Sequence, residues 1–260
     1  RMGDTPMIDM MTGALTDPFG AGHMGITAEN DAERFDISRK AQDEFALMSH
    51  QKALAAIEAG HFKSQIVPVE IKNRHGVTVF HTDEHPKTDT TLESLEKLRP
   101  AFRKDAGTVT AGNASGINDG AAACVLMSAE AAQREGIRPL ARIVSYAVAG
   151  VEPSLMGTGP IPAVRRALMR ADLSLSDISV IESNEAFAAQ SLGVCKGLEL
   201  DPQRTNPNGG AIALGHPLGA SGTIIAIKCL YELQRTSGRY GLITMCIGGG
   251  QGIALLIVRL

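Results

Sequence analysis

From residue 139 onward, apolar runs of strand length alternate with helical stretches, and this alternation restricts the fold more than any other feature of the sequence. It is typical of a layered α/β domain with a mostly parallel sheet. The turn before the last run is too short for a crossover, which predicts an antiparallel final pair. In chain order, we expect strands at 141–148, 178–183, 240–246 and 253–259 and helices at 162–171, 185–198 and 217–234. The last of these helices is apolar nearly all round, which predicts burial, with packing between two sheets as one option.

The first half of the chain is less regular. Residues 1–26 are expected to form a long loop with short helical pieces. Two runs, "IVPVEIK" and "VTVFHTDE", are separated by the turn "NRHG" and predict a β-hairpin. A small apolar run at 121–127 predicts a further strand. Helices are predicted at 27–35 with Thr27 as N-cap, at 38–60 between Ser38 and the stop Gly60, at 92–98 and at 129–135.

Composition narrows the function classes. The chain has 260 residues, 44% of them hydrophobic, and a net charge of −3, which fits about two globular domains. The near-neutral charge and the lack of a basic run argue against nucleic acid as the main partner. No apolar stretch reaches the roughly 18–20 residues that a membrane span needs. The four cysteines are scattered, which favours reduced thiols over a disulfide framework.

Three polar or reactive residues stand at expected strand ends. Asn184 follows one strand, His216 precedes a helix, and Cys246 ends a strand before three glycines. Ligands of layered α/β domains bind at the carboxyl ends of strands, so a site for proton transfer is expected there. Taken singly, each residue also has a structural interpretation: a core thiol, a loop histidine and an N-cap asparagine.

The stretch "GGAIALGHPLGASG" at 209–222 surrounds His216 with five glycines. Glycine lets the backbone adopt positive φ and approach a ligand closely. The helix expected from Pro217 would place its positive N-terminal end next to His216. Two other patterns carry less: "GGGQG" is a hairpin turn and does not match a phosphate-binding loop, and "HTDEH" at 81–85 is not expected to bind a metal.

Several motifs together resemble the thiolase family, in particular the biosynthetic acetyl-CoA acetyltransferases. They are "NEAFAAQ" (184–190), "NGGAIALGHPLGASG" (208–222), "CIGGGQG" (246–252), "TAGNASGINDGAAA" (110–123) and "GHMGITAEN" (22–30). The resemblance implies an α/β fold of five αβαβα layers. It implies a CoA-binding loop domain at 1–117, the end of the N-terminal thiolase domain at 118–138 and the C-terminal thiolase domain at 139–260.

The resemblance also implies an activity, the Claisen condensation of two acetyl-CoA to acetoacetyl-CoA and CoA, or its thiolytic reverse. Cys246 would be the acid/base that exchanges the α-proton, and Gly248 N–H would donate to an oxyanion. His216 would activate the acyl-accepting cysteine and donate to a second oxyanion, near which Asn184 would hold a water. General acid–base help of this kind is worth about 10²–10⁴ in rate.

By the same resemblance, coenzyme A would enter as substrate and product, with no further cofactor. A set of mostly apolar residues would line its path, and Lys87 stands where the family often has an arginine near the nucleotide. The set is Leu15, His23, Met24, Lys87, Phe102, Ala111, Ser115, Ala186 and Phe187. Met24 favours a short acyl pocket.

The family mechanism needs a second cysteine that carries the acyl group. Cys124, Cys195 and Cys229 fall within an expected strand or helices, so the acyl-accepting cysteine is expected upstream of this chain, on a longer chain or a separate N-terminal polypeptide. Two alternatives stay open: a degradative 3-ketoacyl-CoA thiolase of broader chain length, and a non-catalytic CoA-binding remnant. Cys246 argues against a β-ketoacyl synthase. A cytoplasmic homo-oligomer, dimer or tetramer, is expected, with mitochondrial and peroxisomal locations open.

Overall fold

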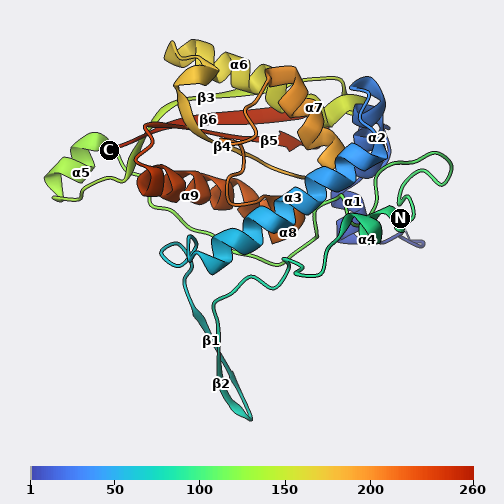
Figure 1. Cartoon of the computed structure of the whole chain (residues 1–260), viewed down its shortest axis with the longest axis horizontal. Coiled ribbons are helices and arrows are strands. Elements are labelled where there is room, and N and C mark those ends of the chain that lie inside the picture. The colour runs from blue at the N-terminus through green and yellow to red at the C-terminus, as the bar shows by residue number, and fades with distance from the viewer. Residues whose placement is uncertain (1) are drawn as a thin grey trace.

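The second half of the chain forms one four-stranded sheet. In the computed structural model, which describes residues 2–260, its strands are β3 (Ala141–Gly150), β4 (Ile178–Ser183), β5 (Tyr240–Ile247) and β6 (Gln251–Arg259). Their order is β3-β6-β5-β4 (Figure 1). β4 pairs with β5 in parallel, whereas β6 is antiparallel to both β5 and β3.

Three strands, β3, β4 and β5, therefore run in the same direction and β6 runs opposite to them, which confirms both the mostly parallel sheet and the antiparallel final pair. β6 does not join an edge of the sheet but lies between β3 and β5. A parallel connection needs a dozen or more residues, and only three glycines separate β5 from β6. Gly249 and Gly250 both have a φ of +82°, a conformation that other residues rarely adopt, so the turn reverses the chain at once.

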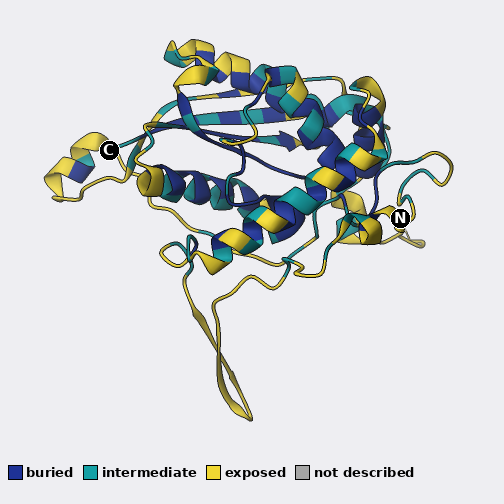
Figure 2. Ribbon diagram, viewed as in Figure 1, coloured by how far each residue is buried: buried dark blue, intermediate teal, exposed yellow. Residues whose placement is uncertain are grey.

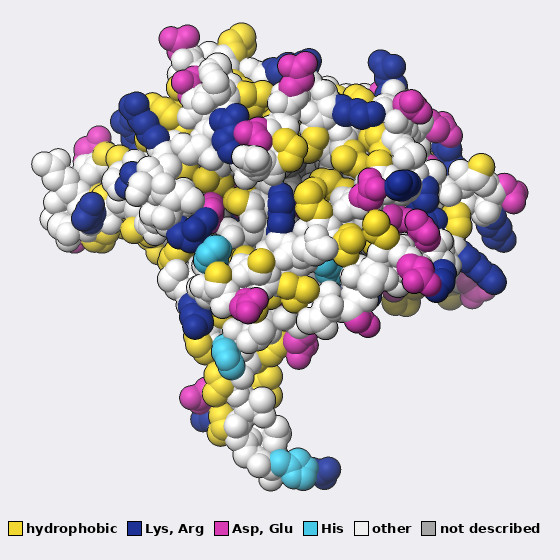
Figure 3. Space-filling view, viewed as in Figure 1, with side chains coloured by type: hydrophobic (Ala, Val, Ile, Leu, Met, Phe, Trp, Pro, Cys, Tyr) yellow, Lys and Arg dark blue, Asp and Glu magenta, His cyan; other side chains and the backbone are white. Residues whose placement is uncertain are grey.

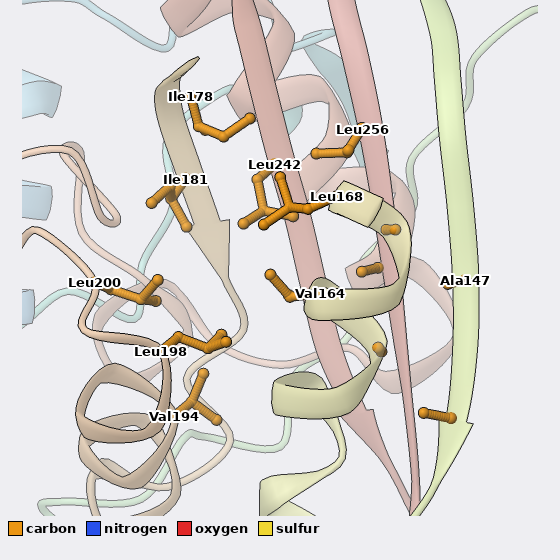
Figure 4. Packing of buried hydrophobic residues seen from close by; sticks show 14 residues of the cluster. Ala147, Val164, Leu168, Ile178, Ile181, Val194, Leu198, Leu200, Leu242 and Leu256 are labelled. Carbon is orange, nitrogen blue, oxygen red and sulfur yellow. The ribbon is translucent and has the colours of Figure 1, made fainter. Parts of the chain in front are cut away.

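Helices cover both faces of this sheet. α6 (Pro160–Ala171) and α7 (Ala188–Leu198) lie over one face, and α9 (Leu218–Thr236) lies over the other (Figure 1). On the first side, buried aliphatic side chains interdigitate between the helices and the sheet, as Figure 4 shows for Val164, Leu168 and Leu242. On the second side, Ile225, Cys229 and Leu233 of α9 pack against β4 and β5. α9 faces only this sheet in the part of the chain described, and Ile224 and Ile227 are half-buried.

The first half of the chain lies along the outside of that domain, with its last helix at the opposite end from the first two (Figure 1). It holds α1 (Met10–Ala14), α2 (Met24–Arg34), α3 (Arg39–Glu58), α4 (Leu92–Glu96) and α5 (Ala129–Arg134), with the hairpin β1 (Val69–Asn73) and β2 (Gly76–Phe80). Short helical turns η1 (Pro153–Thr158), η2 (Leu175–Asp177) and α8 (Ala211–Leu214) complete the chain. α3 packs on α7 and α8, and α2 packs on α7 and η1.

Two predicted helix starts are wrong. α2 begins at Met24, not after Thr27, because the Nδ1 atom of His23 caps it by accepting from Gly25 N–H at 3.0 Å. α7 begins at Ala188, not at Glu185, because the preceding segment is extended and bonded to residues 113–115. Ser115 N–H donates to Ala186 C=O at 3.0 Å, and Ala188 N–H donates to Asn113 C=O at 2.9 Å.

The predicted strand at 121–127 is also not formed. It has no pairing partner among residues 2–260, and Val125 and Leu126 are 84% and 74% exposed. An apolar run becomes a strand only when a neighbour accepts its backbone hydrogen bonds. By contrast, the hairpin and the 38–60 helix are confirmed, and Ser38 caps α3. The hairpin residues are exposed throughout and project from the body with hydrophobic side chains along their length (Figures 2 and 3).

Two neighbours on α6 test the packing. Leu168 belongs to the core beneath α6, whereas Met169 is 73% exposed. Leu168→Ala should lower the free energy of unfolding by about 2–5 kcal/mol, because it leaves a cavity in a close-packed core. Met169→Ala should change it by about 0.5 kcal/mol or less. Urea denaturation measures both, and equal effects at the two positions would contradict the packing described.

Candidate active site

The structure brings the residues at the ends of β4 and β5 to one place. Asn184 follows β4, and its backbone N–H donates to Thr244 C=O of β5 at 2.9 Å, two residues before Cys246. The side-chain Nδ2 of Asn184 lies 3.3 Å from Nε2 of His216, which precedes α9. The expectation that Asn184, His216 and the end of β5 meet at one end of the sheet therefore agrees with the geometry. Asn184 is not a helix N-cap, because α7 starts only at Ala188.

The two ring nitrogens of His216 have different partners. An amide nitrogen can only donate, so Nε2 accepts from Asn184 and the ring proton sits on Nδ1. Nδ1 lies 2.6 Å from Oγ of Ser221, which accepts that proton's hydrogen bond. Burial lowers the pKa of His216, so the imidazole is neutral near pH 7 and its Nε2 lone pair points to Asn184.

Ser221 is a site residue that sequence reasoning missed. It lies in the first turn of α9 and is buried. Its backbone N–H donates to Pro217 C=O at 3.0 Å, which places the hydroxyl over the histidine that precedes the helix. The sequence did contain a sign of this contact, because a side chain in the first turn of a helix, such as Ser221, can reach a residue just before the helix, such as His216.

One glycine next to His216 is needed for this arrangement. Gly215 has a φ of +93°, and a Cβ there would overlap the side chain of Asn118. A larger residue would therefore push away the segment that runs past His216. Gly116 C=O in that segment accepts from His216 N–H at 3.0 Å. The role expected for glycine here, close backbone approach at positive φ, thus has a defined partner.

Cys246 lies in an apolar cluster. Met24, Met156 and Ala186 are buried with it, and Leu15 and Phe187 pack against the group. Burial, with a contribution from the carboxyl of Asp31, raises the pKa of the Cys246 thiol to about 12. The thiol is therefore protonated at neutral pH and has a high affinity for its proton. Gly248, two residues on, approaches the same methionine, because a Cβ there would lie 3.0 Å from Cε of Met24.

Most residues expected along the CoA path are contiguous. His23 stacks on Phe102 with ring centroids 4.8 Å apart, and Phe102 meets Phe187 edge-on at 6.2 Å. Ser115 joins this row through its bond to Ala186. Together with Leu15 and Met24, these side chains form a half-buried wall that leads to Cys246.

Two of the expected residues are not brought into this wall. Lys87 is exposed, and its backbone N–H donates to Nδ1 of His50 on α3 at 3.3 Å. Ala111 is exposed beside Gly112, which contacts Leu95 and Leu98. Their part in CoA binding stays a prediction.

A cavity of about 540 Å³ opens beside His216. The segment from Ile117 to Ala122 and the start of α9 line it, with Met11 at one side. The cavity gives the imidazole access to a reactant. No cluster of three or more metal-ligating side chains occurs among residues 2–260, and none of the helices described is long and apolar enough to cross a bilayer.

Two buried carboxylates hold the segments that carry the site. Oε2 of Glu185 accepts from Ser49 Oγ of α3 at 2.6 Å and from Ile212 N–H of α8 at 3.3 Å, while its Oε1 accepts from Asn206 at 2.8 Å. Glu182 of β4 forms an ion pair with Lys228 of α9 at 2.8 Å, and both side chains are buried. These bonds tie β4 to α3, α8 and α9.

Asp31 is a second residue that the sequence analysis missed. It is 0% exposed, and neither carboxyl oxygen finds a hydrogen-bond partner in the described part of the chain. Burial raises the pKa of this carboxyl to about 8. The helical spacing could have predicted its burial. Asp31 follows Met24, Thr27 and Ala28 by seven, four and three residues, which places it on the buried face of α2.

The raised pKa of Asp31 predicts how stability depends on pH. Between about pH 4 and pH 8, the folded chain keeps a proton that the unfolded chain releases, so the free energy of unfolding falls as pH rises through this window. Asp31→Asn removes that dependence. From pH 5 to pH 8, its stability relative to the parent chain should rise by about 2–4 kcal/mol. Urea denaturation at the two pH values measures this, and a difference that is constant with pH would contradict it.

Comparisons with known proteins agree with the motifs. Residues 1–130 match the family "Thiolase, N-terminal domain", and residues 137–259 match "Thiolase, C-terminal domain". The chain is 60% identical to beta-ketothiolase BktB of Cupriavidus necator and 54% identical to the acetyl-CoA acetyltransferase of Paracoccus denitrificans. Each match covers 100% of this chain but 66% of the relative, so the chain spans about two thirds of their length.

A solved structure shows the same fold. The acetyl-CoA acetyltransferase of Bacillus anthracis superimposes with a TM-score of 0.95 at 51% identity, over 100% of this chain and 66% of the other. The expected α/β fold of the thiolase type is therefore confirmed.

Proposed function

Because the chain belongs to the thiolase family, we propose that it supplies the acid/base and oxyanion-binding part of an acetyl-CoA acetyltransferase site. The reaction is the condensation of two acetyl-CoA to acetoacetyl-CoA and CoA, or the thiolytic reverse. The observation that carries the proposal is the hydrogen-bonded series Ser221–His216–Asn184 at the strand end where Cys246 lies in an apolar wall. The names of the relatives support it.

In the first half-reaction, a cysteine thiol becomes acetylated and CoA leaves. The neutral His216 is suited to take that thiol's proton on Nε2, because Ser221 holds the other ring proton on Nδ1. The Cys246 thiol gives its proton to the departing CoA sulfur and becomes the thiolate that the second half-reaction needs. The imidazolium keeps its own proton and returns it to the acyl-accepting cysteine when that thiolate is released. When charged, the ring also donates to the oxyanion of the thioester, which one preorganised donor stabilises by about 3–4 kcal/mol. Asn184 fixes the ring and holds a water at the same oxyanion.

In the second half-reaction, the thiolate of Cys246 takes an α-proton from the second acetyl-CoA. The carbanion attacks the acetyl carbonyl, the new C–C bond forms, and the C–S bond to the acetylated cysteine breaks. The high proton affinity of the Cys246 sulfur suits it to a weakly acidic carbon. We assign the Gly248 N–H as the donor to the enolate oxygen, since Gly248 and Cys246 both adjoin Met24.

We further propose that the acyl-accepting cysteine is none of the four in this sequence. Burial raises the pKa of Cys195 to about 11 and that of Cys229 well above its usual value, so neither is an activated nucleophile. Cys124 is exposed in the unpaired 118–127 segment. The cavity beside His216 is the place where we expect the acylated sulfur. It belongs to a longer chain or to a separate N-terminal polypeptide.

The wall of Leu15, Met24 and Phe187 is proposed as the acyl and pantetheine path, with CoA as the ligand and no further cofactor. The proposed parts are the CoA-binding loop domain at 1–117, the end of the N-terminal domain at 118–138 and the C-terminal domain at 139–260. We also propose a cytoplasmic dimer or tetramer, with the mitochondrion or peroxisome as alternative locations.

A second candidate function, thiolysis of longer 3-ketoacyl-CoA, is favoured by the 60% identity to a beta-ketothiolase. Rates with acetoacetyl-CoA and longer 3-ketoacyl-CoA distinguish the two.

Proton exchange tests the role of Cys246 without the acyl-accepting cysteine. In D₂O, the chain should catalyse deuterium incorporation into the methyl group of acetyl-CoA, because that step needs only the acid/base and an oxyanion donor. Cys246→Ser should reduce the rate by about 10²-fold or more. Mass spectrometry of recovered acetyl-CoA measures it, and Cys195→Ser is the control that should leave the rate unchanged. Exchange that survives in Cys246→Ser would overturn the assignment.

Intact mass under denaturing conditions, after brief exposure to acetoacetyl-CoA, tests acyl transfer. We expect an acetyl group on a longer chain or a second polypeptide, outside these 260 residues. A single species of this sequence without an adduct would leave a CoA-binding remnant as the function of the chain. Acetylation of one of the four cysteines described would show that the nucleophile was misassigned.

A further inference from the structure

The carboxyl of Asp31 is buried against η1, where Gly157 leaves room for it. α2 packs on η1, where a Cβ at Gly157 would overlap Oδ2 of Asp31. The same Cβ would contact the side chain of Gln190 on α7, whose Nε2 also has no partner among residues 2–260. The three elements thus enclose a carboxyl and an amide that do not bond to each other.

Asp31 and Cys246 adjoin the same short segment of η1, since Oδ2 of Asp31 lies against Gly157 and Cys246 packs with Met156. Met156, next to Gly157, packs in the apolar cluster of Cys246, as does Met24 at the start of α2. Both side chains are buried, so a charge on one raises the free energy of a charge on the other. In agreement, a negative Asp31 raises the pKa of the Cys246 thiol, after burial itself.

The charged groups on the surrounding elements do not neutralise Asp31. On α2, Glu29 accepts from Thr108 and Val109, and Glu33 pairs with Arg103 at the surface. On α7, Lys196 donates to the backbone beyond the end of α2, at Phe35 and Asp36. η1 carries no ionisable side chain. On the side of Cys246, His23 stacks on Phe102, and His216 is held by Ser221 and Asn184.

We propose that Asp31 and Cys246 form a coupled pair of buried acids that carry at most one negative charge between them, so that ionisation of Asp31 suppresses ionisation of the Cys246 thiol. The catalytic meaning of this pair rests on the proposed role of Cys246. Asp31 does not touch the substrate and acts through Cys246 as a positioning residue. Below about pH 8 the carboxyl is protonated and leaves the thiol free to exchange protons, whereas above it the carboxylate opposes the thiolate. The pair therefore sets an upper pH limit for proton exchange by Cys246.

Alkylation of the thiols by iodoacetamide tests the coupling, since only the thiolate reacts. Peptide mass spectrometry gives the rate at Cys246 and at Cys195, which lies on α7 and reports any change in local opening. In Asp31→Asn, the ratio of the Cys246 rate to the Cys195 rate should be unchanged at pH 6.5. At pH 9 the ratio should rise about three- to tenfold, because one unit of pKa is a tenfold change in thiolate.

Glu33→Gln is the matched control. It removes one negative charge from the same helix, two residues away, but from an exposed side chain. Its ratio should equal that of the parent chain at both pH values. An unchanged ratio in Asp31→Asn at pH 9, or an equal rise in Glu33→Gln, would overturn the coupling.

Deuterium exchange into acetyl-CoA separates this proposal from the proposed function. If exchange is absent in every variant while alkylation shows the coupling, the coupled acid pair is supported and the proposed function is overturned. If exchange occurs but its decline above pH 8 is the same in Asp31→Asn and the parent chain, the function stands and the coupling falls.

Discussion

The arrangement of the site depends on two buried carboxylates, at the end of β4 and just beyond it. A buried carboxylate that loses its partners costs several kcal/mol, so its hydrogen bonds act as firm constraints on the segments that supply them. Glu185 binds α3, α8 and the loop at Asn206, and Glu182 binds α9. Asn184 lies between these two residues in sequence, and His216 lies between α8 and α9. The bonds that hold the layers together therefore also fix the distance between the amide and the imidazole.

Around that frame, the reactive groups are kept uncharged at neutral pH. Burial lowers the pKa of His216 and raises the pKa values of Cys246 and Asp31. An acid and a base that rest in neutral form impose no strong field on an approaching thioester. Charge then develops only during the reaction, where backbone and side-chain donors are already oriented to receive it.

Local patterns predicted those parts of the fold that local chemistry decides. The bounds of β4 were predicted correctly, as were the start of α3 at Ser38 and the β1–β2 hairpin, because periodicity, a capping serine and a turn act within a few residues. The expected cluster of Asn184 and His216 also followed from strand ends. The errors arise from distant partners: α7 starts late because residues 113–115 bind the segment before it, and 121–127 has no neighbour. His23 is an uncommon helix cap, and Asp31 was overlooked because a carboxylate on an amphipathic helix is usually solvated.

The position of β6 has a consequence for how the chain acquires its fold. β3 pairs only with β6 in the described sheet. Its last residue, Gly150, cannot form its pair until Gln251 has been synthesised, about a hundred residues later. The sheet therefore cannot close as the chain leaves the ribosome strand by strand. Until β6 arrives, β3 and β5 present unsatisfied edges, which is a state prone to association with other chains. The centre of the sheet therefore closes late and slowly. Before it closes, the unpaired edges of β3 and β5 are the part of the chain that a chaperone would protect from association.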